Sequence, residues 1–233
     1  MAFIEFRDVV KEYGAGEHAI RAADRVSFEI EKGEFAVILG PSGAGKSTVL
    51  NLLGGMDRAT GGAIRVDGTD ISRFNDDALT SYRCDTIGFV FQFYNLIPTL
   101  TACENVALVK DIVKNAADAG EALEAVGLGD HLRQFPAQLS GGEQQRMSIA
   151  RAVSKKPKLL LCDEPTGALD SETGMMILAL LQRMCRENGQ TVVVVTHNTV
   201  LTQIADRVIR LKNGRIVEQS VNPAPMRAEE VSW

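Results

Sequence analysis

The segment that most constrains the fold is a glycine-rich octapeptide at residues 40–47, which reads Gly-Pro-Ser-Gly-Ala-Gly-Lys-Ser. It directly follows the apolar run 35–39 and leads into a stretch with helical spacing at 46–53. A strand, a glycine-rich turn and a helix in this order are typical of α/β folds. Three further apolar runs have the length and composition of buried parallel strands, at residues 87–91, 159–162 and 192–195. The sequence therefore predicts an α/β fold around a parallel sheet.

The residues before the octapeptide predict a second layer of sheet. Alternating apolar and polar residues at 4–10 and 26–30 are typical of half-buried strands. Between residues 93 and 157 there is no convincing strand pattern, and the stretches 103–113, 116–126 and 140–155 have helical spacing. We therefore expect an N-terminal sheet layer and an inserted α-helical subdomain.

The end of the chain carries a hairpin signal and then loses its pattern. Asn213-Gly214 lies between two strand-like runs, and both residue types tolerate the positive φ of a tight hairpin turn. The residues after Ser220 contain two prolines and look like a loose tail. There is no internal repeat, so we expect one domain over residues 1–220 and a tail over 221–233.

The octapeptide also matches the pattern GxxxxGK[ST], whose chemistry suits a nucleoside triphosphate. Its glycines let backbone N–H groups converge on phosphate oxygens at a helix N-terminus. Lys46 would then reach the β and γ phosphates, and Ser47 would bind Mg²⁺. The candidate nucleotide-binding residues in this segment are Gly40, Pro41, Ser42, Gly43, Ala44, Gly45, Lys46, Ser47 and Thr48.

Two carboxylates follow the apolar run 159–162. Asp163 and Glu164 are expected at the C-terminal edge of the sheet, where doubly wound folds bind ligands. Asp163 suits the outer coordination sphere of Mg²⁺. Glu164 is positioned to orient and deprotonate an attacking water, so we predict hydrolysis with Glu164 as the general base.

The segment Leu139-Ser140-Gly141-Gly142-Glu143-Gln144-Gln145-Arg146 resembles the LSGGQ signature of the ABC (ATP-binding cassette) ATPases. Ser140 and Glu143 also have the spacing of a capping box, so a helix is expected from Gly141. A capped helix N-terminus with two glycines attracts phosphate. The resemblance implies that Ser140, Gly141, Gly142 and Glu143 close over ATP held by a second copy of the chain.

The resemblance covers nearly the whole chain, with the other motifs in the family order. Gln92 falls at the Q-loop, Ala168-Leu169-Asp170 at the D-loop, and His197 at the switch-histidine position after a valine-rich strand. Taken alone, Gln92 would be an ordinary loop residue and His197 an ordinary histidine. The resemblance implies a P-loop NTPase (RecA-like) core with an antiparallel β subdomain and the inserted helical subdomain.

The same resemblance implies roles for particular residues. It places Glu164, His197, Gln92 and Lys46 in catalysis, Asp170 beside the nucleotide, and Ser47 and Gln92 on Mg²⁺. Tyr13 lies where the family has an aromatic that stacks on adenine, although the residue is also consistent with a packed aromatic at a strand end.

The stretches YGAGEHAI, DEPTGALDS and VFQFYNLIPTLTACENV are most similar to one ABC subgroup, which includes the lipoprotein-release, macrolide-export and FtsE-like cell-division ATPases. Two residues depart from it: Asn198 stands where aspartate is usual, and Cys162 where alanine is common. The resemblance implies a homodimeric ATPase that uses ATP and Mg²⁺ to power a separate membrane permease of an exporter or mechanotransmission-type complex. Two alternatives stay open: an FtsE-like regulatory ATPase that signals without transport, and a soluble ABC ATPase of DNA repair or translation.

Charge and composition bear on partners and location. The net charge of −5 and the pI near 5.3 give no basic footprint for nucleic acid. No apolar run approaches the length of about 18–20 residues that crosses a bilayer, so a membrane role needs another chain. The four cysteines lack metal-ligand spacing and fit a reducing cytosol. We therefore expect a peripheral protein at the cytoplasmic face of the membrane.

Overall fold

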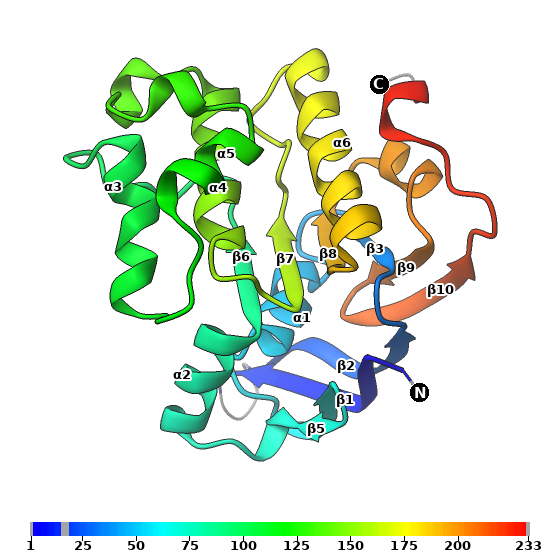
Figure 1. Cartoon of the computed structure of the whole chain (residues 1–233). Coiled ribbons are helices and arrows are strands. Elements are labelled where there is room, and N and C mark those ends of the chain that lie inside the picture. The colour runs from blue at the N-terminus through cyan, green and yellow to red at the C-terminus, as the bar shows by residue number, and fades with distance from the viewer. Residues whose placement is uncertain (1, 15–18, 232–233) are drawn as a thin grey trace.

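Two β-sheets pack on opposite sides of one helix in the computed structural model, which describes residues 2–14 and 19–231 (Figure 1). The helix is α1 (Lys46–Leu53), which begins within the glycine-rich octapeptide and contacts strands of both sheets. Residues 15–18 of the stretch YGAGEHAI lie outside the described residues. The glycine-rich segment therefore lies at the junction of the two sheets.

The larger sheet has six strands in the order β10-β9-β3-β8-β7-β6. Its centre is β3 (Phe35–Leu39), which pairs in parallel with β8 (Thr191–Thr196) and β9 (Arg207–Lys212). The sheet is completed by β7 (Leu159–Asp163), β6 (Ile87–Val90) and the antiparallel edge strand β10 (Arg215–Val221). The predicted parallel sheet is confirmed, and the predicted hairpin at Asn213-Gly214 joins β9 to β10, with positive φ at both residues.

The smaller sheet is antiparallel, with the order β2-β1-β4-β5. Its strands are β1 (Ile4–Tyr13), β2 (Ile20–Ile30), β4 (Gly61–Val66) and β5 (Thr69–Asp70). Along β1, Ile4 and Phe6 are buried beneath the sheet, as alternation predicts. A register shift after Phe6, where Asp8 has φ +46°, then places Val9 rather than Asp8 on the buried side. β4 and β5 form a hairpin that was not among the strands expected from the sequence.

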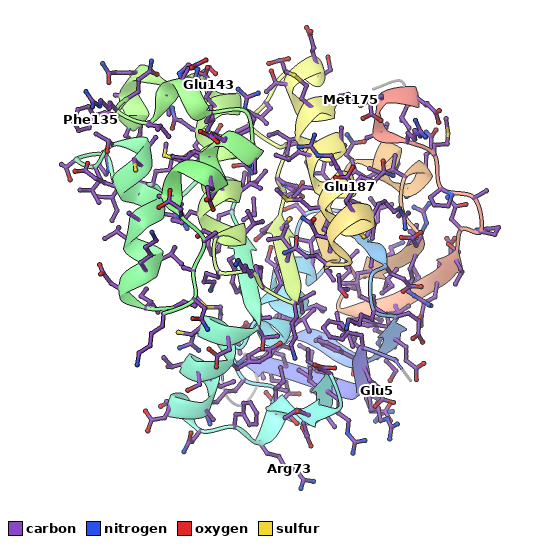
Figure 2. The ribbon with its side chains drawn as sticks, in the orientation of Figure 1. Glu5, Arg73, Phe135, Glu143, Met175 and Glu187 are labelled. Carbon is purple, nitrogen blue, oxygen red and sulfur yellow. The ribbon has the colours of Figure 1, made fainter. Side chains whose placement is uncertain are left out.

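Helices occupy the interval between β6 and β7, and Figure 2 shows Phe135 and Glu143 at this end of the molecule, far from Glu5 and Arg73. The elements are α3 (Ala102–Ala107), η3 (Leu108–Asp111), α4 (Ala119–Ala125), η4 (Gly129–His131), η5 (Pro136–Gln138) and α5 (Gly141–Val153). The three expected helices are present but shorter than their sequence patterns. Asp118, for example, accepts a hydrogen bond from Gly120 N–H and so begins α4 at Ala119.

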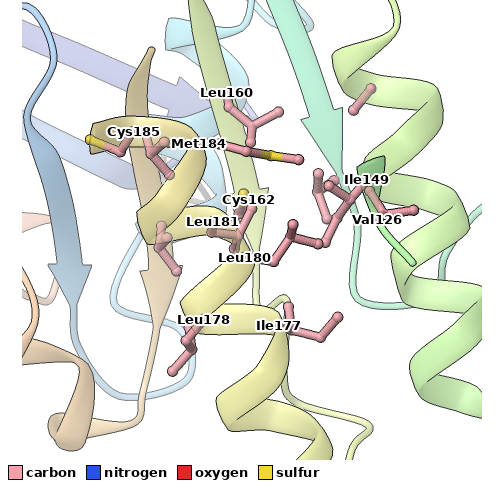
Figure 3. Close-up of a cluster of buried hydrophobic side chains, with 14 of the residues drawn as sticks. Val126, Ile149, Leu160, Cys162, Ile177, Leu178, Leu180, Leu181, Met184 and Cys185 are labelled. Carbon is pink, nitrogen blue, oxygen red and sulfur yellow. The ribbon is translucent and has the colours of Figure 1, made fainter. Parts of the chain in front are cut away.

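The remaining helices are α2 (Asp76–Asp85), α6 (Ser171–Asn188) and the short η2 (Ile71–Arg73), η6 (Thr199–Gln203) and η7 (Ala228–Glu230). Alternate residues of the six-stranded sheet divide between two cores. Leu160 and Cys162 of β7 face α6, whereas Leu159 and Leu161 face α1. Figure 3 shows the α6 side, where Ile177, Leu181 and Met184 pack near Leu160 and Cys162. This two-sided burial explains why the strands read as continuous apolar runs.

The segment after β10 is docked on α6, in contrast to the loose tail expected from the sequence. Gln182 of α6 donates from Nε2 to Met226 O at 2.8 Å and accepts from Ala228 N–H at 3.0 Å. Ala228 and Val231 are buried in the same core as the apolar face of α6. A buried amide that satisfies two backbone groups therefore anchors this segment. Within the described residues no helix combines the length and apolar character needed to cross a membrane.

Candidate functional site

A cleft of about 810 Å³ opens at the carboxyl edge of the six-stranded sheet. Strands β3, β6, β7 and β8 all end here, and each is followed by residues that the sequence analysis selected. The lining residues are Ala22, Pro41, Ser42, Gly43, Ala44, Gly45, Lys46, Ser47, Thr48, Gln92, Asp163, Glu164 and His197. The structure thus gathers segments that are far apart in the sequence into one site.

The backbone of the octapeptide depends on glycine at position 45. Gly45 has φ +97°, and a Cβ there would lie 2.2 Å from the Ala22 carbonyl oxygen. A larger residue would therefore be strained in conformation and would also clash with β2. Gly214 of the β9–β10 turn donates its N–H to Ala44 O at 3.0 Å, which holds the loop from the other side. The loop is fixed by backbone contacts with both sheets.

The side chain of Lys46 lies against the backbone of this loop. Its ammonium donates to the carbonyl oxygens of Gly40 at 2.9 Å and Pro41 at 3.1 Å, and lies 3.9 Å from Glu164 Oε1. Only 8% of the residue is exposed. A nearly buried ammonium that contacts carbonyl groups and a carboxylate at the base of a cleft is well placed to attract a polyanion.

Glu164 is held in a strained and oriented conformation at the end of β7. Its φ of +46° is unusual for a residue with a side chain. Oε2 accepts a hydrogen bond from Thr196 Oγ at 3.0 Å, and Oε1 lies 3.0 Å from His197 Nδ1. The carboxylate is therefore oriented by two consecutive residues at the end of β8. Thr196 was not predicted from the sequence, where its only signal is its position before His197.

Asp163 and Ser47 form the second polar group of the cleft. Ser47 Oγ donates to Asp163 Oδ1 at 3.3 Å. Burial raises the pKa of Asp163, the neighbouring Glu164 carboxylate raises it further, and the Ser47 hydroxyl opposes the shift. The described residues contain no cluster of three or more His, Cys, Asp or Glu side chains that could hold a metal alone. Hard oxygen donors from Ser47, Asp163 and Gln92 fit Mg²⁺ in a site completed by phosphate oxygens and water.

Gln92 lines the cleft at the end of β6, close to the loop that follows Glu164. A Cβ on Gly167 would lie 2.9 Å from Gln92 Nε2. Tyr94 and Asn95 both have positive φ, and their carbonyl oxygens accept hydrogen bonds from the Arg151 guanidinium at 3.0 and 2.7 Å. Burial lowers the pKa of Arg151. Arg151 of α5 thus fixes the loop after Gln92, a contact that sequence spacing could not reveal.

Tyr13 lies at the margin of the site, at the end of β1. It is not among the described residues that line the cleft. Burial and the hydrogen bond to Asp57 raise the pKa of its phenol, and the Thr48 hydroxyl opposes this shift. The phenol donates to Asp57 Oδ2 at 2.7 Å, and Lys11 Nζ lies 4.8 Å from the ring centroid. Tyr13 remains 42% exposed. Its ring is anchored and still accessible to a ligand.

Among the described residues, those of the segment Ser140–Glu143 do not line the cleft. Ser140 caps α5 as expected, and the capping box with Glu143 is confirmed. Figure 2 places Glu143 at the outer end of the helical region, away from α1. Asp170 is likewise absent from the lining and caps α6 by accepting from Thr173 N–H at 2.9 Å. The two capped helix ends touch, because a Cβ on Gly142 would lie 2.2 Å from Thr173 Cγ2.

Comparisons with known proteins agree with this arrangement. The family model described as "ABC transporter" matches residues 23–167, which include the octapeptide, Gln92, Ser140–Glu143 and Asp163-Glu164. The lipoprotein-releasing system ATP-binding protein LolD of Geobacter metallireducens is 44% identical over 93% of this chain and 98% of its own length. The macrolide export ATP-binding/permease protein MacB of Rhodospirillum rubrum is 45% identical over 97% of this chain, which spans only 35% of that protein.

A solved structure supports the fold independently. The dimeric structure of the ATP-binding cassette MJ0796 of Methanocaldococcus jannaschii, in a post-hydrolysis state bound to ADP and Pi, has a TM-score of 0.86. It is 43% identical in sequence, and the match covers 94% of this chain and 98% of that one. The similarity therefore extends over both sheets and the helical region between them.

Proposed function

Because this chain belongs to the ABC transporter family and matches ATP-binding cassettes in fold and over most of its length, we propose that it is the ATP-hydrolysing subunit of an exporter or mechanotransmission-type complex. The observation that carries the proposal is the cleft, which joins the octapeptide to Gln92, Asp163, Glu164 and His197.

ATP is held by the octapeptide. The N–H groups at the start of α1 bind phosphate oxygens, and Lys46 exchanges its contacts with Gly40 O and Pro41 O for the β and γ phosphates. Mg²⁺ would be held by Ser47 and Gln92, with Asp163 in its outer sphere, and would supply positive charge to the phosphates. Tyr13 supplies a stacking surface for the adenine base.

Hydrolysis uses Glu164 as the base. The carboxylate accepts the proton of a water that attacks the γ phosphate, and ADP and phosphate are the products. Thr196 Oγ–H and His197 Nδ1–H, with the ring proton on Nδ1, hold the carboxylate in place. Because its two oxygens contact the last residue of β8 and the residue after it, a shift of β8 relative to β7 would change the orientation of the carboxylate.

Each site is completed by a second copy of the chain. The N-terminus of α5 carries Ser140 and two glycines but does not line the cleft of its own chain. A partner in the reciprocal orientation would place this helix end over the γ phosphate, where its N–H groups and the Ser140 hydroxyl can donate. The dimeric form of the similar MJ0796 cassette supports this arrangement.

A membrane permease is the proposed mechanical partner, on the cytoplasmic face of the membrane. Exposed apolar side chains gather on the loop after Gln92 and on the helical region: Phe93, Ile97, Leu108 and Ile112. Phe93 is 78% exposed although it immediately follows a residue of the cleft. Partner contacts at Phe93 would therefore reach Gln92 directly. Co-purification of a candidate permease with this chain should be lost on Phe93→Asp, and unchanged co-purification would contradict a role for this surface.

A mixed-dimer experiment tests the shared site. On a Glu164→Gln background, which blocks hydrolysis, one Lys46→Ala chain and one Ser140→Ala chain form a dimer with one intact and one doubly damaged site. Sedimentation with Mg-ATP should then show partial recovery of dimer. The matched control mixes a labelled Lys46→Ala/Ser140→Ala chain with an unlabelled chain that carries neither change, and follows the label alone, because the unlabelled chain also dimerises with itself. Each shared site of this labelled heterodimer has one lesion, so the labelled chain should stay monomeric. The reverse pattern would show that Ser140 serves its own chain's nucleotide.

A further inference from the structure

The hydroxyl of Ser140 is already committed to a hydrogen bond within its own chain. Ser140 Oγ donates to Glu143 Oε2 at 2.8 Å, and Ser140 N–H donates to the same oxygen at 2.7 Å. Glu143 N–H donates in return to Ser140 Oγ at 3.3 Å. A serine hydroxyl has a single hydrogen to donate. Ser140 can therefore donate to a phosphate oxygen only after releasing Glu143.

Glu143 carries a negative charge at this point. The Ser140 N–H and hydroxyl groups lower the pKa of the Glu143 carboxyl, so it is ionised at neutral pH. The basic side chains beside it are His131, whose Nε2 is 3.7 Å from Oε1, and Arg146. Within the described part of the chain, no lysine or arginine forms an ion pair with this carboxylate. The helix end that is proposed to receive a polyanion thus carries its own anion.

We propose that Glu143 acts as an electrostatic brake on the shared ATP site, a positioning residue that holds Ser140 Oγ and repels the partner's triphosphate. The inference rests on the proposed function, because it needs ATP presented by a second copy. Two negative groups brought close together oppose association, most strongly where water is excluded. The brake would keep the ATP-bound dimer weak enough to reopen after hydrolysis.

The charge and the cap can be separated by one substitution. Glutamine also completes a capping box, because its amide oxygen accepts the same two hydrogen bonds. Glu143→Gln therefore preserves the start of α5 and removes only the charge. The chain also contains a matched control at the start of α3. There Glu104 Oε2 accepts from Thr101 N–H at 2.8 Å and Thr101 Oγ at 2.7 Å, with a return bond of 3.3 Å.

The experiment compares ATP-driven dimerisation by sedimentation in Mg-ATP, on the Glu164→Gln background and at low salt. Glu143→Gln removes one repulsive charge at each of the two shared sites, both partly exposed, and should tighten the dimer by about tenfold in total. Glu104→Gln removes an equivalent charge from an equivalent cap and should leave the dimer unchanged. Ser140→Ala, which removes the donor, should weaken it.

Salt provides a second readout on the same two chains. Screening weakens the repulsion between charges, so added salt should tighten the dimer of the chain with Glu143 more than that of Glu143→Gln. The affinity of the monomer for ATP should be the same in both, because Glu143 lies outside the cleft of its own chain.

The outcomes distinguish the brake from the shared site. If Ser140→Ala weakens the dimer while Glu143→Gln has no effect or loosens it, Glu143 is only a helix cap and the brake is refuted. If neither variant changes dimerisation, the shared site itself fails. Equal tightening by Glu104→Gln would also refute the inference, because the effect would then follow net charge rather than position.

Discussion

Gly142 offers a quantitative test of how α5 packs against α6. Gly142→Ala would place a Cβ 2.2 Å from Thr173 Cγ2, where carbon atoms in contact are normally about 3.5–4.0 Å apart. Thr173 cannot turn away freely, because its Oγ donates to Asp170 Oδ2 at 2.7 Å. Either that bond breaks or α5 and α6 separate. We expect Gly142→Ala to lower the free energy of unfolding by about 2 kcal/mol.

Thr173→Ser should relieve the clash, because it removes Cγ2 and keeps the hydroxyl bonded to Asp170. The next atoms of Thr173 lie 3.6 and 3.8 Å from the added Cβ, which are ordinary contacts. Urea unfolding of the two single variants and the double variant should therefore give a coupling free energy of about 2 kcal/mol. A double variant as unstable as Gly142→Ala would refute the packing argument.

The rescued variant also separates packing from function. If the backbone at Gly142 must approach the partner's phosphate, the Gly142→Ala/Thr173→Ser chain should be stable and still fail to dimerise with Mg-ATP. Normal dimerisation by this chain would mean that glycine is needed at position 142 only to fit against Thr173.

Three further predictions concern the cleft. Glu164→Gln should bind ATP, lose most turnover and accumulate dimer, whereas Lys46→Ala should weaken ATP binding itself; wild-type turnover by Glu164→Gln would refute its role as base. Tyr13 offers a stacking surface, but among the described residues no side chain was identified that hydrogen-bonds the edge of the base, so GTP should compete with ATP for binding. Tyr13→Ala should weaken the binding of both nucleotides alike, and a preference for ATP of about a thousandfold or more would contradict this. Asp163→Asn should raise the nucleotide-free unfolding free energy at pH 7, because burial raises the pKa of Asp163 and disfavours its charged form. That gain should shrink as the pH falls through the raised pKa of the folded state, and it should vanish below the ordinary aspartate pKa, where the carboxyl is protonated in both states. A gain independent of pH in urea unfolding would refute the assignment.

Local signals explain why much of the fold could be predicted. The run 35–39 coincides with β3, and the Asn213-Gly214 turn has the positive φ angles that its residue types indicate. Asp67-Gly68 carries the same signal and joins β4 to β5, so that hairpin could also have been identified. The helix ends at Ser140 and Asp170 follow from capping chemistry within three residues.

The contacts that were missed depend on tertiary packing. Thr196 orients Glu164, and Arg151 holds the carbonyl groups of Tyr94 and Asn95, but neither pairing has a fixed spacing in sequence. The docked segment after β10 was missed for the same reason. Its polar and proline-rich sequence gives no sign of Gln182, the buried amide on α6 that binds its backbone. The roles of the site residues stay predictions until the variants above are measured.

The position of β3 between β8 and β9 sets the order in which the molecule can form. Both of its neighbours belong to the last quarter of the chain, and such non-local pairing makes folding slow. During synthesis at about 5–20 residues per second, Phe35–Leu39 would wait about 8–30 s for Thr191–Thr196 to appear. For that interval an apolar strand has no partner in its sheet, while the helical segment can form on local contacts. Protease protection of ribosome-bound chains should therefore reach the glycine-rich loop only after β9 has emerged.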